Sequence, residues 1–442
     1  MTASSSHRRP LRKVMVASLV GSSLEWYDFF LYATASALVL NKVFFPGSDP
    51  TAGTLLSLAT FGVGFVVRPV GAALFGVIGD RFGRKPSLVI TLILMGLATA
   101  LIGLLPGYAS IGLWAPVSLV VLRLLQGLGA GAEHGGATIF AAEHSPPSKR
   151  GFFGSIAASG MYVGVLLSSG IFALFALLPH DAFLSWGWRA PFLISVGLVA
   201  VGLYIRLGID ETPQFRESNE TEAAGSPLIV VFRDQWRSVL TVIGIVAAPF
   251  TATYVYQTYS LTYLQRYHEP AGSIGTVSLT AASVVAIVMV PVAGRLSDRV
   301  GRRPVIVVGA VFSALFAFPF FWLLDAGSPA AVPVAMVGGV GIGVPLMLGP
   351  QGALLAELFG ARSRFTGFAL SRELGSLLFA GMTPLIAAVL VTEAGGHSWP
   401  VSCYVVGACL ITLATGLLVS DIKPVAATPV GPSPADAAQP RH

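Results

Sequence analysis

The amino-acid sequence predicts an all-α membrane protein with twelve transmembrane helices in two six-helix bundles. Of the 442 residues, 54% are hydrophobic and only 11% are charged. A soluble domain does not need that much apolar surface once its core is full. The apolar residues fall into long runs, and about 20 such residues span a bilayer as a helix. A charged loop motif also occurs once in each half of the chain.

Twelve apolar runs follow one another along the sequence. They lack the alternation of strands, and a backbone in lipid has to satisfy its amides within its own segment, so each run is predicted to be a helix. The long polar interruption at 209–236 separates the first six runs from the last six. The runs are 14–40, 54–79, 86–106, 112–142, 152–178, 188–208, 237–265, 273–296, 304–325, 329–357, 365–391 and 398–420.

The polar interruption and the two tails divide the chain into five predicted parts. The first apolar run is longer than the core of a signal peptide, so we expect it to remain on the protein. The C-terminal segment is rich in Pro and Ala and is predicted to be disordered. The parts are an N-terminal tail (1–13), an N-terminal bundle (14–208), a central loop (209–236), a C-terminal bundle (237–420) and a C-terminal tail (421–442).

The basic residues predict the orientation of the helices. Most of the 27 Lys and Arg residues lie in segments on the same side of the membrane as the N-terminus. Because cytoplasmic loops carry an excess of positive charge, both termini and the central loop are expected in the cytoplasm of a plasma (inner) membrane protein. The exceptions are Lys42, Arg189 and Arg266 on the other side, and Arg68, Arg123 and Arg372 within helices.

The two halves of the chain resemble each other. GDRFGRK at 79–85 corresponds to SDRVGRR at 297–303. The pairs Glu143/Arg150 and Glu357/Arg364 also recur at nearly the same offset. Parallel repeats of six helices are typical of one transporter architecture.

These motifs resemble those of the major facilitator superfamily, through GVIGDRFGRK (76–85), GRLSDRVGRR (294–303) and RLLQGLGAG (123–131). LEWYDFFLY, FGVGFVVRPVGAALFG and SWGWRAPFL further resemble the metabolite:proton symporter family, and ALVLNKVFFP with FLSWGWRAPFL looks most like the shikimate permeases. The resemblance implies the major facilitator fold and import of small carboxylates or zwitterions with protons. The fourth helix departs from the family in having His134 where an aromatic residue is usual.

Ionisable side chains at membrane depth are costly and usually mark a pathway for substrate or protons. In the first predicted helix, Glu25, Asp28 and Tyr32 share one face. In the fourth, Glu133 precedes His134, whose imidazole is suited to proton relay. Glu25, Asp28, Glu133 and His134 are therefore proton-coupling candidates. Alternatively, the acids form permanent pairs with buried arginines and the histidine is only packed.

A guanidinium at membrane depth offers a planar fork for a substrate carboxylate, and amphipathic rings suit a cyclic, hydroxylated substrate. The alternatives are structural ion pairs for the arginines, including pairing of Arg372 and Glu373 with neighbouring helices, and an interfacial aromatic belt that includes Tyr263. The predicted substrate-binding residues are Tyr32, Arg68, Arg123, Gln126, Tyr256, Gln257, Tyr259, Gln351 and Arg372.

The repeated loop motif is predicted to gate access. An acidic residue near a helix N-terminus, flanked by arginines and a glycine turn, can clamp helices of the two halves together at the cytoplasmic face. Alternatively, its positive charges only fix topology. The predicted gating residues are Asp80, Arg81, Arg84, Lys85, Asp298, Arg299, Arg302 and Arg303.

The sequence contains no P-loop, metal-ligand spacing or nucleophile elbow, so neither an enzyme nor an ATP-driven pump is expected. We expect a monomeric symporter without a cofactor, driven by the proton gradient, whose partners are a small-molecule substrate, protons and the lipid bilayer rather than nucleic acid. The substrate predicted first is a shikimate-like organic acid. Alternatives are an osmolyte such as proline or betaine, citrate or α-ketoglutarate, and, in another class, a nontransporting membrane sensor.

Overall fold

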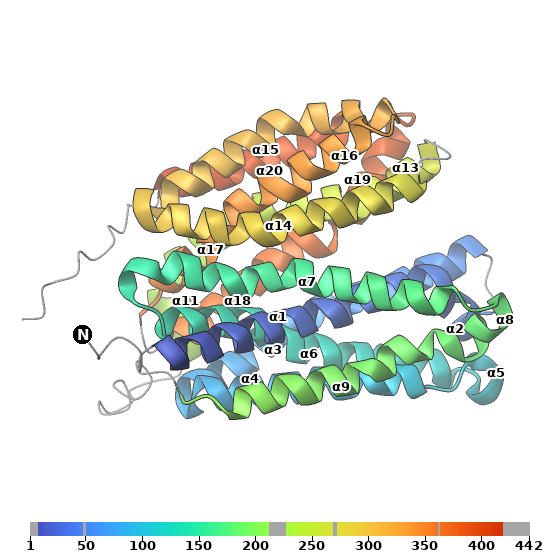
Figure 1. The fold of residues 1–442 in the computed structure, drawn as a ribbon, viewed down its shortest axis with the longest axis horizontal. Helices are drawn as coiled ribbons and strands as arrows, with labels where there is room; N and C mark the ends of the chain where they lie inside the picture. The colour runs from blue at the N-terminus through green and yellow to red at the C-terminus, as the bar shows by residue number, and fades with distance from the viewer. Residues whose placement is uncertain (1–7, 47–49, 212–226, 268–271, 361–362, 419–442) are drawn as a thin grey trace, which may run out of the picture.

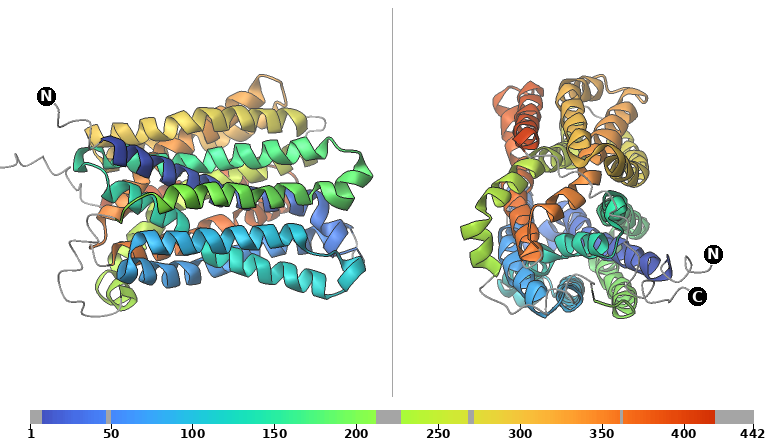
Figure 2. Two further views of the ribbon diagram at one scale, coloured as in Figure 1. Left: turned by 60° about the horizontal axis from the view of Figure 1, so that its bottom comes forward. Right: turned by 90° about the vertical axis from the view of Figure 1, so that its left-hand side faces the viewer.

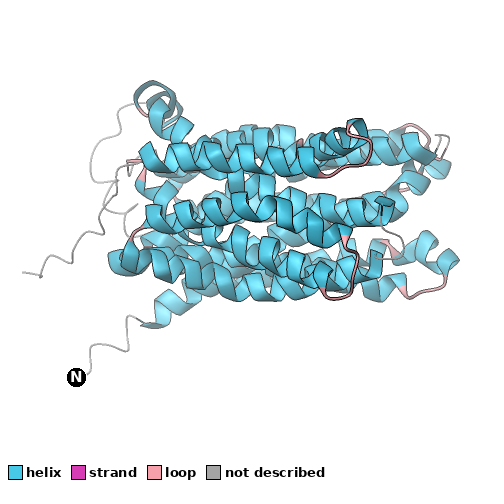
Figure 3. Cartoon of the chain, turned by 90° about the horizontal axis from the view of Figure 1, so that it is seen from above, coloured by secondary structure: helices cyan, strands magenta, loops and turns pink. Residues whose placement is uncertain are grey.

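The computed structural model describes residues 8–46, 50–211, 227–267, 272–360 and 363–418. Within these ranges every regular element is a helix, as Figure 3 shows. The long helices run side by side along the longest axis of the molecule (Figure 1). The all-α prediction is confirmed. The predicted C-terminal tail, 421–442, lies outside the described residues.

The first half of the chain supplies six long helices. Short helical segments connect them or extend their ends. The long helices are α1 (Arg8–Ala35), α3 (Pro50–Phe82), α4 (Arg84–Leu104), α6 (Trp114–Glu143), α7 (Arg150–Ala176) and α9 (Arg189–Leu207). The short ones are η1 (Ser36–Leu40), α2 (Asn41–Phe44), α5 (Tyr108–Ile111), η2 (Pro147–Lys149), α8 (His180–Ala182) and η3 (Phe183–Gly187).

The second half also supplies six spans, but three of them change from α-helix to π-helix and back near their middle. The interrupted spans are α12 (Trp236–Thr253), η4 (Tyr254–Tyr259), α13 (Ser260–Tyr267); α16 (Ala331–Met336), η5 (Val337–Gly343), α17 (Val344–Glu357); and α18 (Arg364–Ser376), η6 (Leu377–Gly381), α19 (Thr383–Glu393). The continuous ones are α14 (Gly272–Val300), α15 (Arg302–Asp325) and α20 (Trp399–Leu418). A short helix, α11 (Pro227–Asp234), forms within the expected central loop.

Among the described residues, 11 helices are long and apolar enough to cross a membrane. The remaining span is α1, whose 28 residues include Glu25 and Asp28. It packs against α6, α7 and α9 inside the first bundle. These helices together give the twelve-helix fold that the sequence predicts. The helix begins at Arg8, six residues before the predicted apolar run, since an apolar run cannot indicate helical turns made of basic residues.

The two bundles pack against each other through a limited set of helices. In the first half, α1 packs on α7 and α3 packs on α6, and in the second half α15 packs on α17 and α20. Contacts between the halves join α14 to α7 and α18 to α3, and Figure 2 shows the two groups of helices end-on. We call the end with the two charged loops the motif end. In Figure 1, α7 and α14 converge towards this end, at the left.

Glycines at two places fix this architecture. Gly83 and Gly301 have φ values of 111° and 99°, which L side chains rarely adopt, and each makes the turn between two helices of its motif. In α6, Gly127 and Gly131 lie directly against backbone oxygens of α3, those of Gly64 and Arg68, so that a Cβ would not fit. The GLGAG sequence therefore brings α3 and α6 into close contact and positions the arginines that both carry.

Candidate functional site

A buried ion-pair network joins the two bundles near the middle of the helices. Arg68 of α3 places Nη2 2.5 Å from Glu25 Oε1 of α1 and Nε 2.8 Å from Glu373 Oε2 of α18. Glu373 Oε1 also binds Arg372. All four side chains are almost completely buried. One guanidinium is thus shared by carboxylates that belong to different halves of the protein.

His134 of α6 lies beside this network. Its Nδ1 is 4.0 Å from Glu25 Oε2 and 3.5 Å from Ser22 Oγ. Trp26 packs edge-on against the imidazole, with ring centroids 6.4 Å apart. The histidine is therefore the buried titratable group next to Glu25 on the side away from Arg68, a position in which it can exchange a proton with that carboxylate.

A second polar cluster surrounds Arg123 of α6. Its Nη1 lies 2.5 Å from Gln126 Oε1, and Gln126 Nε2 donates to Thr99 Oγ1 at 2.7 Å. The guanidinium stacks over the ring of Tyr32, 3.9 Å from its centroid. Asp28 interacts electrostatically with Arg123 and with Thr99. Arg123 is therefore held by an aromatic face and an amide, with one carboxylate nearby.

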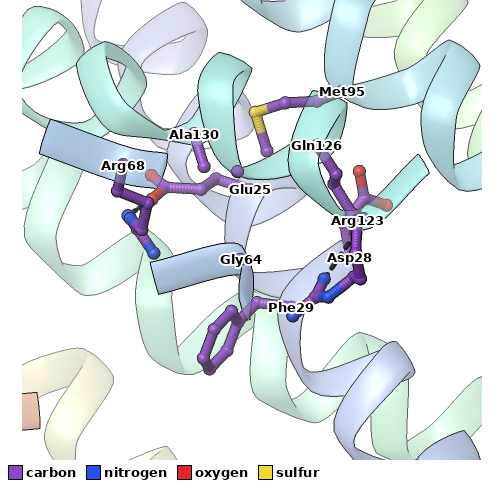
Figure 4. Close-up of a pocket in the computed structure, with 10 residues that line it drawn as sticks. Glu25, Asp28, Phe29, Gly64, Arg68, Met95, Arg123, Gln126 and Ala130 are labelled. Carbon is purple, nitrogen blue, oxygen red and sulfur yellow. Dashed lines mark hydrogen bonds and ion pairs between the residues drawn. The ribbon is translucent and has the colours of Figure 1, made fainter. Parts of the chain in front are cut away.

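The two clusters line opposite sides of one small cavity of about 20 Å³ (Figure 4). Glu25 and Arg68 lie on one side, and Asp28, Arg123 and Gln126 on the other, with Phe29 and Met95 between them. Two guanidiniums and two carboxylates around an apolar patch suit a small metabolite that carries a carboxylate, and the bundles must move apart to admit it. Gly64, Gly127 and Ala130 complete the wall.

The aromatic residues of the seventh span lie differently from the prediction based on α-helical spacing. Tyr256 is fully buried inside the second bundle, where its ring packs on Phe320 at 4.1 Å. Tyr254 instead faces the first bundle, with its ring 6.0 Å from Phe65 and 6.5 Å from Phe29. Both tyrosines lie in the π-helical η4, whose residue spacing differs from that of an α-helix. Sequence reasoning therefore missed Tyr254.

Three further predicted substrate-binding residues lie in the second bundle but do not line the cavity. Tyr259 packs on Tyr263, with ring centroids 6.1 Å apart. Gln257 is buried, and neither of its side-chain amide atoms has a hydrogen-bond partner within the described part of the chain. The same holds for Gln351 Nε2. Buried amides without partners are uncommon in folded proteins, so both glutamines have spare capacity for a ligand.

Glu133 does not join His134 at the network. Both its oxygens bind Arg206 of α9, and Oε2 accepts a hydrogen bond from Thr91 at 2.9 Å. Consecutive residues of an α-helix point about 100° apart, so His134 faces the cavity region and Glu133 faces the interior of the first bundle. Sequence reasoning did not pair Glu133 with Arg206, because Arg206 ends an apolar run and resembles a topology signal.

At the motif end, each aspartate of the repeat caps a helix of the opposite bundle. Asp80 accepts hydrogen bonds from the backbone N–H groups of Phe365 and Thr366, at 3.2 and 2.9 Å, at the start of α18. Asp298 accepts from the N–H groups of Gly151 and Phe152, both at 2.8 Å, at the start of α7. A carboxylate at a helix N-terminus is stabilised by the exposed amides and the helix dipole.

Arginines complete both clamps. Arg84 is buried, 3.3 Å from Glu143, and Arg364 reaches the same carboxylate from the second bundle at 3.4 Å. Arg302 pairs with Asp298 at 2.5 Å and with Glu357 at 3.6 Å.

The other predicted gating residues lie at the edge of the clamps. Arg81 and Arg299 are exposed, and Arg303 is half-buried. Lys85 donates to the backbone oxygen of Leu207 at 2.9 Å. Among the described residues, no cluster of His, Cys, Asp and Glu could hold a metal ion.

Two membrane-spanning bundles of six helices, joined by a buried ion-pair network beside a charged cavity, are typical of a secondary transporter. The chain belongs to the Major Facilitator Superfamily, whose family model matches residues 18–380 and 271–439. The resemblance of the loop motifs is thereby confirmed. Members of this family are transporters of small molecules, not enzymes, and the chain is accordingly a multi-pass membrane transporter of metabolites.

Several relatives are similar over most of their length. The chain is 41% identical to the inner membrane metabolite transport protein YhjE of Escherichia coli (strain K12), over 93% of this chain and 94% of that protein. It is 38% identical to the shikimate transporter of the same strain, with the same coverage of 93% and 94%. It is 36% identical to the proline/betaine transporter of that strain, over 93% of this chain and 84% of the relative.

Solved structures confirm the fold. The proton:xylose symporter XylE bound to 6-bromo-6-deoxy-D-glucose superimposes with a TM-score of 0.77 at 16% identity, over 95% of this chain and 98% of that one. The inward open conformation of XylE from E. coli gives a TM-score of 0.65 at 18% identity, over 93% of this chain and 97% of that one.

Proposed function

We propose that the protein is a proton-coupled symporter that imports a small organic acid by alternating access. The motif end and both termini face the cytoplasm. The protein lies in the inner membrane and works as a monomer. The proton gradient supplies the energy, without a cofactor. The observation that carries this proposal is the sharing of Arg68 between Glu25 of the first bundle and Glu373 of the second.

Protonation of one of these carboxylates changes what Arg68 can bind. A buried guanidinium that loses a paired carboxylate is left with an uncompensated charge, which is strongly unfavourable. A substrate carboxylate restores the pairing and offers the planar geometry that a guanidinium prefers. Proton binding at Glu25 or Glu373 therefore favours binding of the substrate. His134, 4.0 Å from Glu25, is placed to deliver or receive the proton.

The charge balance of the site supports proton coupling. Around the cavity, Glu25, Asp28 and Glu373 are matched by Arg68, Arg123 and Arg372. An anionic substrate adds a negative charge to this balanced set, and an unbalanced charge away from water is costly. One bound proton per substrate charge removes the imbalance.

The clamps at the motif end support alternating access. Asp80 and Asp298 hold helix ends of the opposite bundle, so the motif end is closed. Release of substrate on that side requires both clamps to open while the bundles rotate around the central site. The many basic residues at this end support a cytoplasmic location for it.

The 38% identity to a shikimate transporter supports a shikimate-like acid as the first candidate substrate. A second candidate is a zwitterion, since the chain is 36% identical to a proline/betaine transporter and the cavity wall includes Glu25 and Asp28. Citrate and α-ketoglutarate remain alternatives.

The test is uptake into proteoliposomes under an imposed pH difference. Labelled shikimate would compete with quinate, protocatechuate, α-ketoglutarate, citrate, proline and betaine. Accumulation that collapses with a protonophore supports symport. Binding without uptake of any of these compounds overturns transport in favour of a sensor.

A further inference from the structure

We infer that a groove between α7 and α14 at the motif end binds the phosphate headgroup of an anionic phospholipid. The groove has a volume of about 370 Å³. Lys149 and Phe152 of the first bundle form one wall, and Arg295, Asp298 and Arg299 of the second bundle form the other. A ligand in this groove therefore touches both bundles at once.

The charge of the groove favours an anion. Within the part of the chain that the structure describes, Lys149, Arg295 and Arg299 form no ion pair with an acidic side chain. The carboxylate of Asp298 is already bound by the amides of α7 and by Arg302. Three cations thus surround the groove without compensation from the protein, an arrangement that a phosphate group complements.

The neighbouring surface identifies the anion as a lipid rather than a soluble ion. Val284, Val288, Val292 and Leu296 follow one another every four residues on α14 and are 53%, 60%, 49% and 43% exposed. They form an apolar strip along a membrane-spanning helix, and it ends at the level of the groove. Acyl chains can lie along this strip while the headgroup occupies the groove. Basic pockets between transmembrane helices on the cytoplasmic side are known lipid headgroup sites.

The internal repeat indicates that the basic residues of the groove do more than orient the protein in the membrane. Val77 occupies in the first copy of the motif the position that Arg295 occupies in the second. Likewise, Ser363 precedes the capped helix α18 at the position that Lys149 occupies before the capped helix α7. Ser148 of the groove corresponds in turn to Arg362, which lies outside the described residues. Both copies make the aspartate clamp, so the clamp does not require Arg295 or Lys149. Lys149 and Arg295 therefore lie at the clamp of Asp298, whereas the clamp of Asp80 has Ser363 and Val77 at the equivalent positions.

A lipid in the groove has a direct consequence for the transport cycle. Its headgroup links Lys149 to Arg295 and Arg299 across the joint that Asp298 closes. The joint must separate when the motif end opens. The lipid therefore stabilises the state in which the motif end is closed, because it binds that state better than the open one.

The first experiment measures lipid retention on the purified transporter by native mass spectrometry, from mixed micelles with equal phosphatidylglycerol and phosphatidylcholine. The test variant is Lys149→Ser with Arg295→Val, which installs the residues that the first copy uses. The control variant, Arg233→Ala with Arg237→Ala, removes two exposed positive charges from the same end. We expect the parent and the control to retain phosphatidylglycerol preferentially and the test variant to lose the preference by about tenfold.

The second experiment measures labelling of Ser155→Cys, a buried position behind the clamp of α7, in a background without Cys403 and Cys409. Phosphatidylglycerol in the vesicles should slow labelling in the parent but not in the Lys149→Ser/Arg295→Val variant. Three outcomes would overturn the inference: no lipid preference in the parent, equal loss in the control variant, or displacement of the lipid by millimolar inorganic phosphate, which would make a soluble anion the occupant. None of these readouts depends on the identity of the transported substrate.

Discussion

Arg68 Nε lies 2.8 Å from Glu373 Oε2, so that an ion pair joins the two bundles at the level of the central cavity. The same guanidinium binds Glu25 through Nη2. Rotation of the bundles must lengthen or break the first contact but leaves the second inside one bundle. In the proposed cycle, Arg68 would therefore respond both to the conformation of the transporter and to the protonation of the two carboxylates.

The first prediction concerns the proton. Glu25→Gln removes the charge and keeps the shape, so it should abolish accumulation driven by a pH difference while exchange of substrate across the membrane continues. A difference of about one pH unit supports about tenfold accumulation for one coupled proton, and the variant should stay near onefold. Uptake and exchange in proteoliposomes measure this.

Asp28→Asn is the comparison, because Asp28 lies at the Arg123 side of the cavity. Full accumulation by both variants would remove the first helix from the coupling scheme.

The second prediction concerns the net charge carried per cycle. Because the acids and arginines around the cavity balance, a monoanion should enter with one proton and carry no net charge. Its uptake should respond to an imposed pH difference and be insensitive to a potassium diffusion potential set with valinomycin. Stimulation of monoanion uptake by a negative interior would contradict the balanced-charge account.

The third prediction concerns Arg123, whose guanidinium stacks on Tyr32 and binds Gln126. Arg123→Lys keeps the charge but loses the planar fork and the stacking surface. Loss of one charge-assisted hydrogen bond of about 1.5–3 kcal/mol corresponds to roughly a tenfold to hundredfold rise in the substrate Kd. Titration of binding in detergent measures it, and an unchanged Kd would show that Arg123 acts only as a point charge.

The fourth prediction concerns the clamp. Asp80→Asn weakens the hydrogen bonds that the backbone amides of Phe365 and Thr366 donate to this side chain, so the motif end should open more often. A coupling of about 1.4 kcal/mol is a tenfold change in the conformational ratio. Ser155→Cys should label faster, transport should fall, and binding in detergent should persist. Lost binding with unchanged labelling would assign the loop to folding or to the site itself.

The fifth prediction separates Glu133 from coupling. Glu133→Gln leaves Arg206 buried without its carboxylate, which typically costs about 3–5 kcal/mol. The thermal unfolding midpoint should fall, whereas accumulation per folded transporter should be retained. The double variant Glu133→Gln/Arg206→Met removes both charges and should recover stability. Loss of accumulation by a stable double variant would return Glu133 to the proton pathway.

The sequence predicted the fold well because hydrophobic length, charge position and the repeated motif each reflect strong physical constraints. It also indicated that Asp80 and Asp298 are parts of a clamp between the halves, because a carboxylate near a helix N-terminus can accept hydrogen bonds from the exposed backbone amides. The cavity residues Glu25, Asp28, Arg68, Arg123 and Gln126 were found for a similar reason, since polar groups at membrane depth are rare.

What the sequence could not predict depended on geometry. Periodicity assumes an α-helix, so the π-helical turn of η4 moved Tyr254 rather than Tyr256 towards the first bundle. The pairing of Glu133 with Arg206 required knowledge of how α6 and α9 lie. For Glu373 the sequence indicates a candidate residue that could pair with a neighbouring helix, but no spacing within α18 indicates that the partner is Arg68 of α3.

The π-helical segments give the two halves unequal mechanical properties. In the first half α3, α4, α6 and α7 are uninterrupted and the π-helical η1 and η3 lie near helix ends, whereas η4, η5 and η6 break three spans of the second half near their middle. Single π-helical turns are frequent at functional sites and are places where helices kink. The residues that line the cavity all belong to the less interrupted half. We therefore expect changes in the first half to alter the size of cargo accepted, and changes in η4, η5 or η6 to alter how readily the second half moves against it.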